Sequence, residues 1–400
     1  MATLNPRRFA QPDTLKSIAH ERLIAFLAPF AAYLADRELV LPDGADEEID
    51  YGLLSSILMS PDEKTPPAMA DALYFIHEMA TTDEMDRLLE AAKVAGLTLD
   101  DTPESSPADI AVQVWLQDRD LLERQHAEIM VHRPKSFEYF AGKVGGPQGM
   151  PEPAAKELEA IQADLDAWFS DHKRGTGSKV FVFPDKGKDK AWILVRHGMP
   201  MKREGATKDG ESSSVYYRPE VHDVLVYDTT LDEIGIHTGT KGERTLYREV
   251  FGSHLFDDST YFPDGEKFTL QPLIADGADS LVCTDVDGIE WVKLKEVQRY
   301  WGGKHKEIET RRADDLFAAM ATRSASFPAT AKLIKAVFLV KFEDAKTPRT
   351  VTIRPKNIAN YTRDDDSTRI EAWLVNRGFA LAPEQEGDED ESTEAALADA

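Results

Sequence analysis

The chain has 400 residues, of which 72 are acidic and 47 are basic, so its formal charge at pH 7 is −25. Because 42% of the residues are hydrophobic, there is enough apolar material for packed cores, and this excludes wholesale disorder. A length of 400 residues favours two or three domains. The single cysteine, Cys283, excludes both an intramolecular disulfide and a cysteine-built metal cluster.

No segment of the sequence predicts export or membrane insertion. The first residues lack the apolar stretch of a secretory signal. The longest uncharged run, residues 23–35, contains Pro29 and is far shorter than the roughly 20 residues that span a bilayer. We therefore expect a cytoplasmic protein, and a bacterial one, without contact to a membrane.

The charge is distributed unevenly along the chain. Residues 1–175 carry a net charge of −16 and residues 176–294 carry −7, whereas residues 295–377 carry +6. The last segment, residues 378–400, holds eight acidic and no basic residues. The whole-chain charge disfavours uniform binding of a polyanion, but a local contact through the basic segment is still possible.

Residues 1–141 predict an all-α bundle. Apolar residues recur at helical spacing from Leu15 to Leu34, with a break expected at Pro29. One or two helices are expected between residues 68 and 95, the second closed by Gly96. A single helix is expected over residues 107–132, where the apolar side chains form one stripe.

Residues 142–153 contain four glycines and three prolines and predict a linker, after which residues 154–300 predict an α+β domain. Helices are expected from residue 154 to the Gly-Thr-Gly-Ser at 175–178 and over residues 243–256. Expected strands with antiparallel pairing cover residues 179–183, 191–195, 215–217, 221–227, 233–237, 268–273 and 281–294, the last with a hairpin turn at Asp287-Gly288.

Residues 301–379 predict a small basic α+β module, followed by an acidic, disordered tail over residues 380–400. A helix is expected over residues 305–325, a hairpin from residues 336–342 and 349–355, and a last helix over residues 366–377 before Gly378. The fold class expected for the chain is multidomain α+β, with an N-terminal all-α bundle, a mixed domain with an antiparallel sheet, and a small C-terminal α+β module.

Short motifs do not establish a catalytic centre, a metal site or a cofactor site. Val195-Arg196-His197-Gly198 resembles the phosphoryl-accepting signature of histidine phosphatases over three residues, and residues 281–288 resemble the aspartate loop of haloacid-dehalogenase-type phosphatases. Neither has the parallel-sheet context that such chemistry needs. The histidines show no metal-binding spacing, and glycine-rich phosphate loops are absent from the sequence.

A divergent metal-dependent nuclease or phosphohydrolase is one alternative. Asp223, Asp228 and Glu233 surround a predicted hairpin, and carboxylates of this kind, with a lysine, can hold a catalytic cation. A cluster of these three side chains with a lysine would favour this hypothesis, and their dispersal would remove it.

The basic segment contains the candidate residues for nucleic-acid contact. Four bases are expected around one helix start and six, including Lys332 and Lys335, around the hairpin. Tyr300, Trp301 and Tyr361 are nearby aromatic residues that could stack on bases. The predicted contact residues are Lys304, Lys306, Arg311, Arg312, Arg349, Arg354, Lys356 and Arg363.

These observations favour a non-catalytic interaction or regulatory protein, an accessory subunit of a bacterial multi-protein complex in defence or genome maintenance. Its acidic helical half would contact a partner protein, and its basic module would contact nucleic acid. The second alternative, besides the enzyme, is a scaffold that binds only proteins.

Overall fold

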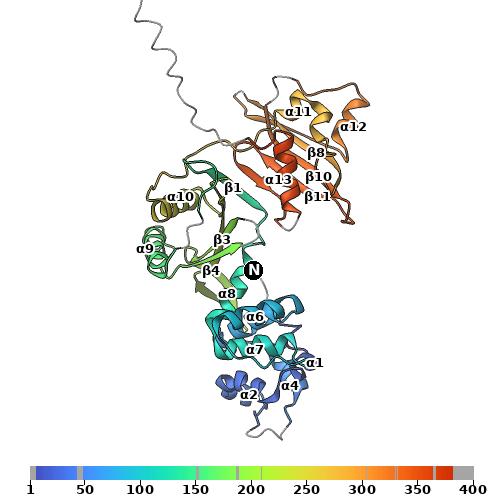
Figure 1. Cartoon of the computed structure of the whole chain (residues 1–400). Coiled ribbons are helices and arrows are strands. Elements are labelled where there is room, and N and C mark those ends of the chain that lie inside the picture. The colour runs from blue at the N-terminus through green and yellow to red at the C-terminus, as the bar shows by residue number, and fades with distance from the viewer. Residues whose placement is uncertain are drawn as a thin grey trace, which may run out of the picture. The chain divides into compact units, whose positions relative to one another are not determined.

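A computed structural model of the chain describes residues 6–42, 48–149, 153–185, 189–208, 210–302, 304–328, 330, 332–363 and 366–381 (Figure 1). The chain divides into two compact units. The helical unit comprises Met1–Met130 and Arg203–Val215, and the sheet unit comprises Val131–Lys202 and Tyr216–Ala400. The expected mixture of helices and antiparallel sheet is confirmed. In the described part of the chain, no helix is both long enough and apolar enough to cross a bilayer.

The helical unit packs short helices around one apolar core, which includes Phe9, Phe26 and Leu73. Its helices are α1 (Pro12–Lys16), α2 (His20–Leu27), the 3₁₀ turn η1 (Ala28–Phe30), α3 (Ala31–Ala35), α4 (Tyr51–Met59), α5 (Pro67–Met79), α6 (Thr82–Ala95), α7 (Pro107–Gln117) and α8 (Arg119–Met130). The break expected at Pro29 is confirmed by η1. Gly96, at a φ of +74°, ends α6 as predicted.

The single helix expected over residues 107–132 is wrong, because Asp118 divides it into α7 and α8. The backbone of Asp118 is extended (φ −151°, ψ 92°), and its side chain accepts a hydrogen bond of 3.0 Å from the backbone N–H of Leu121. An aspartate that caps the next helix in this way stabilises a helix start at the expense of a continuous helix. The apolar stripe continues across the break, which is why periodicity alone did not reveal it.

The sheet unit is organised around a ten-stranded sheet in which neighbouring strands pair in antiparallel fashion. The order of the strands in space is β2-β3-β6-β7-β1-β12-β11-β10-β8-β9. The strands are β1 (Ser136–Ala141), β2 (Lys179–Asp185), β3 (Lys190–Gly198), β6 (Glu220–Asp228), β7 (Glu233–His237), β8 (Ile289–Gly302), β9 (Glu307–Arg312), β10 (Lys332–Phe342), β11 (Arg349–Arg354) and β12 (Ile358–Asn360). A separate two-stranded sheet contains β4 (Lys202–Lys208) and β5 (Glu211–Tyr217).

Helices cover the two halves of this sheet. The predicted helices α9 (Ala155–Asp171) and α10 (Lys241–Phe256) pack Phe169 and Tyr247 against apolar residues of β2, β3, β6 and β7. The predicted last helix, α13 (Ser367–Asn376), packs Trp373 against Phe338 of β10 and against Phe379. The short helices α11 (Pro272–Ala275) and α12 (Leu316–Ala321) and the 3₁₀ turn η2 (Gly277–Leu281) complete the unit.

Strand β1 is the main difference from the expected helical half. It lies in the middle of the sheet, where it pairs with β7 on one side and with β12 on the other. Its two partners lie about 100 and 220 residues away in the sequence, so no local hairpin signal identifies it. The strand thereby joins the two halves of the sheet unit into one sheet.

The predicted linker at residues 142–153 is ordered over its described part, residues 142–149. The backbone N–H of Gly142 donates to the carbonyl of Asp232 (2.6 Å), and that of Gln148 donates to the carbonyl of Thr229 (2.7 Å). A Cβ at Gly142 would lie 2.2 Å from the Asp232 carboxylate, so only glycine fits at this position. The glycines thus permit close packing against the turn between β6 and β7.

Three further predictions between residues 268 and 325 are wrong. Residues 305–325 do not form one helix, because they contain β9 followed by α12. Phe268 makes only isolated bridges, and α11 follows it in place of a strand. Gly288, at a φ of +82°, leads into β8, and no strand precedes it from residue 281. Strand β8 is 14 residues long and runs across residue 300, where a domain boundary is expected. The hairpin of β10 and β11 is confirmed.

The acidic tail lies outside the described residues from residue 382 onward.

Candidate functional sites

Four of the eight predicted contact residues lie together on the β8–β9 ribbon, which we define as residues 289–312. Lys304 and Lys306 are exposed in the turn between the strands, and Arg311 and Arg312 lie on β9. Arg311 and Arg312 were expected at a helix start, whereas they belong to a strand. Because β9 ends the strand order and pairs only with β8, its other edge carries backbone groups without a strand partner among the described residues.

An open groove runs beside this edge. Arg311 and Arg312 line it from β9, and Arg323 lines it from the segment after α12. The other lining residues are small or apolar, and none of them is acidic. A hollow with three guanidinium groups and no carboxylate in its lining is suited to an anion, because arginine binds phosphate and carboxylate oxygens through several donors.

Aromatic and charged side chains are fixed at the tip of the ribbon. Trp301 is 53% exposed, and the guanidinium of Arg299 lies 3.3 Å from the centre of its ring. Glu309 accepts hydrogen bonds from the Trp301 indole (3.1 Å) and from Arg311 (2.7 Å). The bond from Arg311, together with the one from Trp301, outweighs partial burial and lowers the pKa of the Glu309 carboxyl. The ribbon therefore presents an exposed aromatic ring held in place by its neighbours.

The other four predicted contact residues are dispersed. Arg354 is exposed on β11, three strand positions from β9, which corresponds to about 14 Å at the usual strand spacing. Arg349, at the other end of β11, is paired with Asp366 (2.8 Å). Lys356 is exposed and lies 3.7 Å from Glu266.

Arg363 is buried, at 8% exposure, and does not lie on the basic surface. Its guanidinium donates to the Tyr139 hydroxyl and to the backbone carbonyls of Lys135 (2.6 Å) and Tyr361 (3.1 Å). Tyr361, expected as a stacking residue, is also buried, at 2% exposure. Both side chains line an internal pocket instead.

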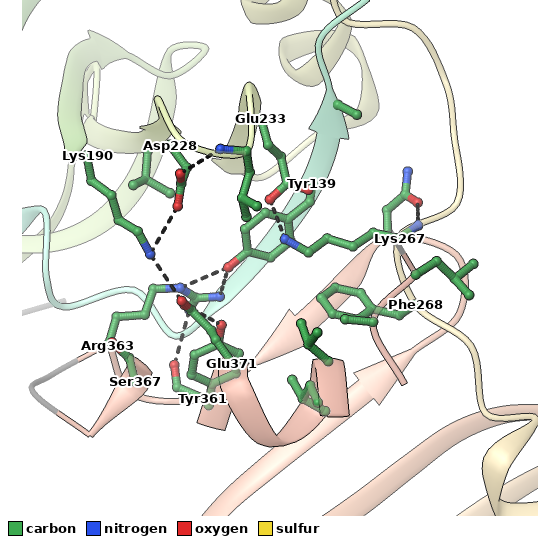
Figure 2. Close-up of a pocket in the computed structure, with 18 of the residues that line it drawn as sticks. Tyr139, Lys190, Asp228, Glu233, Lys267, Phe268, Tyr361, Arg363, Ser367 and Glu371 are labelled. Carbon is green, nitrogen blue, oxygen red and sulfur yellow. Dashed lines mark hydrogen bonds and ion pairs between the residues drawn. The ribbon is translucent and has the colours of Figure 1, made fainter. Parts of the chain in front are cut away.

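This pocket lies in the sheet unit and has a volume of about 320 Å³. Strands β1, β3, β6 and β7 supply one side, and residues 357–381, including α13, supply the other (Figure 2). Three basic and three acidic side chains point toward one another across it in the close-up. They are Lys190, Lys267, Arg363, Asp228, Glu233 and Glu371.

Lys190 connects the two sides of the pocket. Its ammonium lies 3.2 Å from Glu371 of α13 and 3.4 Å from Asp228 of β6 (Figure 2). Burial alone would lower the pKa of Lys190, but the charges of Glu371 and Asp228 outweigh burial and raise it. Burial would likewise raise the pKa of Glu371, whereas Lys190 and Lys267 hold it below its usual value. Both groups are therefore charged at neutral pH.

Lys267 and Glu233 form a second ion pair in the same pocket. The Lys267 ammonium also lies 4.2 Å from the centre of the Tyr139 ring. Burial would lower the pKa of Lys267, but the negative charge of Glu233 raises it. Each buried cation thus has a carboxylate or an aromatic ring beside it, as the cost of removing charge from water requires.

The rest of the pocket wall is aromatic and aliphatic. Trp192 and Phe268 are buried lining residues, and Val226 and Leu374 add aliphatic surface. The ring of His132 packs edge-on against that of Trp192, with 4.7 Å between the ring centres. The pocket therefore combines a charge-paired polar side with an apolar side.

The carboxylates of the nuclease hypothesis do not form one cluster. Asp228 and Glu233 line the pocket with two lysines, whereas Asp223 is not among its lining residues. Residues 223 and 228 lie five positions apart on one strand, which places them on opposite faces and about 17 Å apart. The three carboxylates therefore cannot hold one cation, so they do not form the cluster that would favour the nuclease hypothesis.

Asp223 instead belongs to a buried group with His197 and Glu243, whose ligand atoms lie within 4.8 Å of one another. The distance from His197 Nε2 to Asp223 is 3.1 Å, and the Tyr247 hydroxyl donates to the same carboxylate oxygen (2.7 Å). Arg174 lies 2.5 Å from Glu243. These donors occupy the carboxylates, and the guanidinium supplies the positive charge that a metal ion would bring.

This network also explains the Arg196-His197-Gly198 motif. Histidine at residue 197 stacks on Phe169 of α9, with 4.2 Å between the ring centres, and so helps to attach α9 to the sheet. His254, the second histidine of the phosphatase interpretation, pairs with Asp164 instead (2.7 Å). The motif is accounted for by packing and hydrogen bonding.

Sequence reasoning did not find the pocket. Its polar residues come from segments as far apart as Tyr139 and Glu371, and none of them belongs to a short motif. The one available signal was the presence of Lys190, Asp228 and Glu233 at the ends of apolar strands, where charged side chains face a cavity or solvent.

Comparisons with known proteins leave the family open. No protein-family model matches the chain, and no curated protein matches it.

Proposed function

We propose that the protein acts by binding, and that its sheet unit contacts nucleic acid through the β8–β9 ribbon. The observation that carries this proposal is the groove beside β9, in which Arg311, Arg312 and Arg323 are the charged lining residues. Each of these arginines can offer N–H groups to a phosphate oxygen of a polynucleotide, and Arg311 can do so with the N–H groups that do not donate to Glu309.

The form of the ribbon supports the same proposal. A two-stranded ribbon can lie along phosphates or enter a major groove, and Lys304 and Lys306 extend the basic surface at its tip. Trp301 offers an exposed ring on which a base could stack. Because the whole chain carries −25, the contact should be weak, local and strongly salt-dependent.

The test measures binding of the full chain to fluorescein-labelled single-stranded DNA, duplex DNA and RNA by anisotropy at several salt concentrations. Arg311→Gln with Arg312→Gln removes two phosphate contacts, so the slope of log K against log salt should fall by about 1.4–1.8. The matched control is Lys156→Gln with Lys346→Gln, which changes the net charge equally at two exposed lysines that are neither predicted contact residues nor lining residues of the groove.

Two results would contradict the proposal. One is the absence of polynucleotide binding by the unsubstituted chain at about 50 mM salt, where electrostatic contacts are strong. The other is an equal loss in the control and in the groove variant, which would show that only net charge matters. The first result would favour the scaffold that binds only proteins, and the second would mean that polynucleotide binding does not depend on the groove.

The assignment of the protein as an accessory subunit is part of the same proposal. The helical unit, residues 1–130 and 203–215, carries a net charge of −16, and Val94 of α6 is 85% exposed, so this unit offers an acidic surface with an exposed apolar side chain to a partner protein. Val94→Asp should weaken assembly with such a partner, which is measured by co-purification from the native host. Lys93→Asp is the control and should reduce the recovery of the partner less. Equal recovery of the partner with both variants would contradict this part.

A further inference from the structure

The pocket of the sheet unit is a second site, independent of the basic ribbon. Seven of its lining residues are charged and buried or half-buried, and they come from both sides of the cavity. Its volume of about 320 Å³ lies at the lower end of the range found for small-molecule sites. A cavity of this size accommodates a ligand of one or two fused rings.

The charges in the wall indicate which ligands are disfavoured. The three cations are already engaged by carboxylates, by a tyrosine hydroxyl or by backbone carbonyls, so none is left to serve as an anion clamp. The six charged side chains that face one another are three acids and three bases, so this side of the pocket is charge-paired and offers no net positive charge. A phosphate or a carboxylate would therefore enter a site without a free cation to receive it.

The uncharged wall indicates which ligands are favoured. Trp192 and Phe268 present aromatic surface, and Leu374 and Leu381 add aliphatic surface. Aromatic ligands gain stacking and apolar burial against such a wall, and a positive charge on the ligand can lie over the face of an aromatic ring.

We propose that this pocket binds a small aromatic molecule that is uncharged or carries a single positive charge. The ring of the ligand packs between Trp192 and Leu374, and an amino or amide group of the ligand faces the charge-paired polar side. Because the pocket and the groove at β9 share no lining residue, the two proposals can fail separately.

The test uses three probes with one ring system and different charge: tryptamine, indole-3-acetamide and indole-3-acetate. Adenosine and its 5′-monophosphate form a second pair that differs in charge. Saturation-transfer NMR and calorimetry on the full chain should show binding of at least one uncharged or cationic probe at about 1 mM or tighter. The anionic member of each series should bind at least about tenfold more weakly.

Two substitutions localise the site. Val375 of α13 lines the pocket and is 61% exposed, so Val375→Trp should cover the opening and abolish binding. Leu381→Trp acts from the other lining segment and serves if the first variant does not fold, as judged by circular dichroism. Val144→Trp is the control, because Val144 is 65% exposed in the same unit and does not line the pocket.

The proposal is overturned if no probe binds, if an anionic probe binds as tightly as its uncharged or cationic counterpart, or if folded Val375→Trp and Leu381→Trp proteins bind as the control does. Binding lost in the two pocket variants and kept in Val144→Trp supports it. Polynucleotide binding should be unchanged in all three variants, which separates this site from the ribbon.

Discussion

The ion pairs across the pocket predict a measurable coupling between Lys190 and Glu371. Neutralising one partner of a fully buried ion pair costs about 3–5 kcal/mol, and an exposed pair contributes about 0–1 kcal/mol. Here the side chains are 21% and 34% exposed, and Lys190 keeps Asp228 at 3.4 Å when Glu371 is neutralised. Glu371→Gln should therefore lower the free energy of unfolding by about 1–2 kcal/mol.

The opposite substitution should be more harmful. Lys190→Met leaves both Asp228 and Glu371 without this cation, so we expect a loss of about 2–3 kcal/mol. In the double variant the two losses should not add, because Glu371→Gln removes one of the carboxylates that Lys190→Met leaves unpaired. We expect a coupling energy of about 1 kcal/mol from the cycle.

The assay is thermal and urea unfolding of the full chain, followed by circular dichroism. For a unit of this size, 1 kcal/mol shifts Tm by about 2–4 °C, so both single variants are resolvable. Coupling below about 0.5 kcal/mol would refute the reasoning, because it would mean that the two side chains act independently. Lys346→Gln is the control, because it removes an exposed charge in the same unit and should leave the midpoint unchanged.

Three further outcomes follow from local geometry. Gly142→Ala should lower the free energy of unfolding in urea by about 1–3 kcal/mol, because the new Cβ would lie 2.2 Å from the buried Asp232 carboxylate. Gly149→Ala is the control and should leave the stability unchanged, because no atom lies within 4 Å of its Cβ position. Asp118→Ala should remove the cap of α8 and cost about 1 kcal/mol in the same assay, and an unchanged midpoint would contradict the capping role. The pKa values of Lys190 and Lys267 are raised above their usual 10.5. The stability that their ion pairs supply is therefore fully present below about pH 10.5 and is lost as the pH rises through the higher pKa values of the folded state. A urea midpoint that stays constant across this pH range would contradict this prediction.

Local signals were sufficient for many elements of the fold. The stop at Gly96, the break at Pro29 and the β10–β11 hairpin each depend on residues that are close in sequence. Such features follow from the conformational limits of glycine and proline and from strand pairing across a short loop. They could be predicted because the responsible atoms are neighbours along the chain.

Predictions failed where a distant partner decides the conformation. Residues 307–312 contain charged side chains at spacings compatible with a helix, but pairing with β8 makes them a strand. Arg363 is a charged residue of the kind usually found at a surface. Its guanidinium nevertheless donates to the hydroxyl of Tyr139, 224 residues away, inside the sheet unit. Side-chain type alone does not distinguish an exposed basic residue from a buried one that is hydrogen-bonded or ion-paired.

The amino-acid sequence by itself determined the segregation of charge, the two kinds of secondary structure and the basic segment as a region of interest. Only the tertiary structure decided that β1 lies in the middle of the sheet and that Lys190 meets Glu371, 181 residues further along the chain, across one pocket. The physical reason is that pairing in this sheet is non-local. Hydrogen bonds between strands and ion pairs between buried side chains depend on proximity in space, which a linear pattern of residues does not encode.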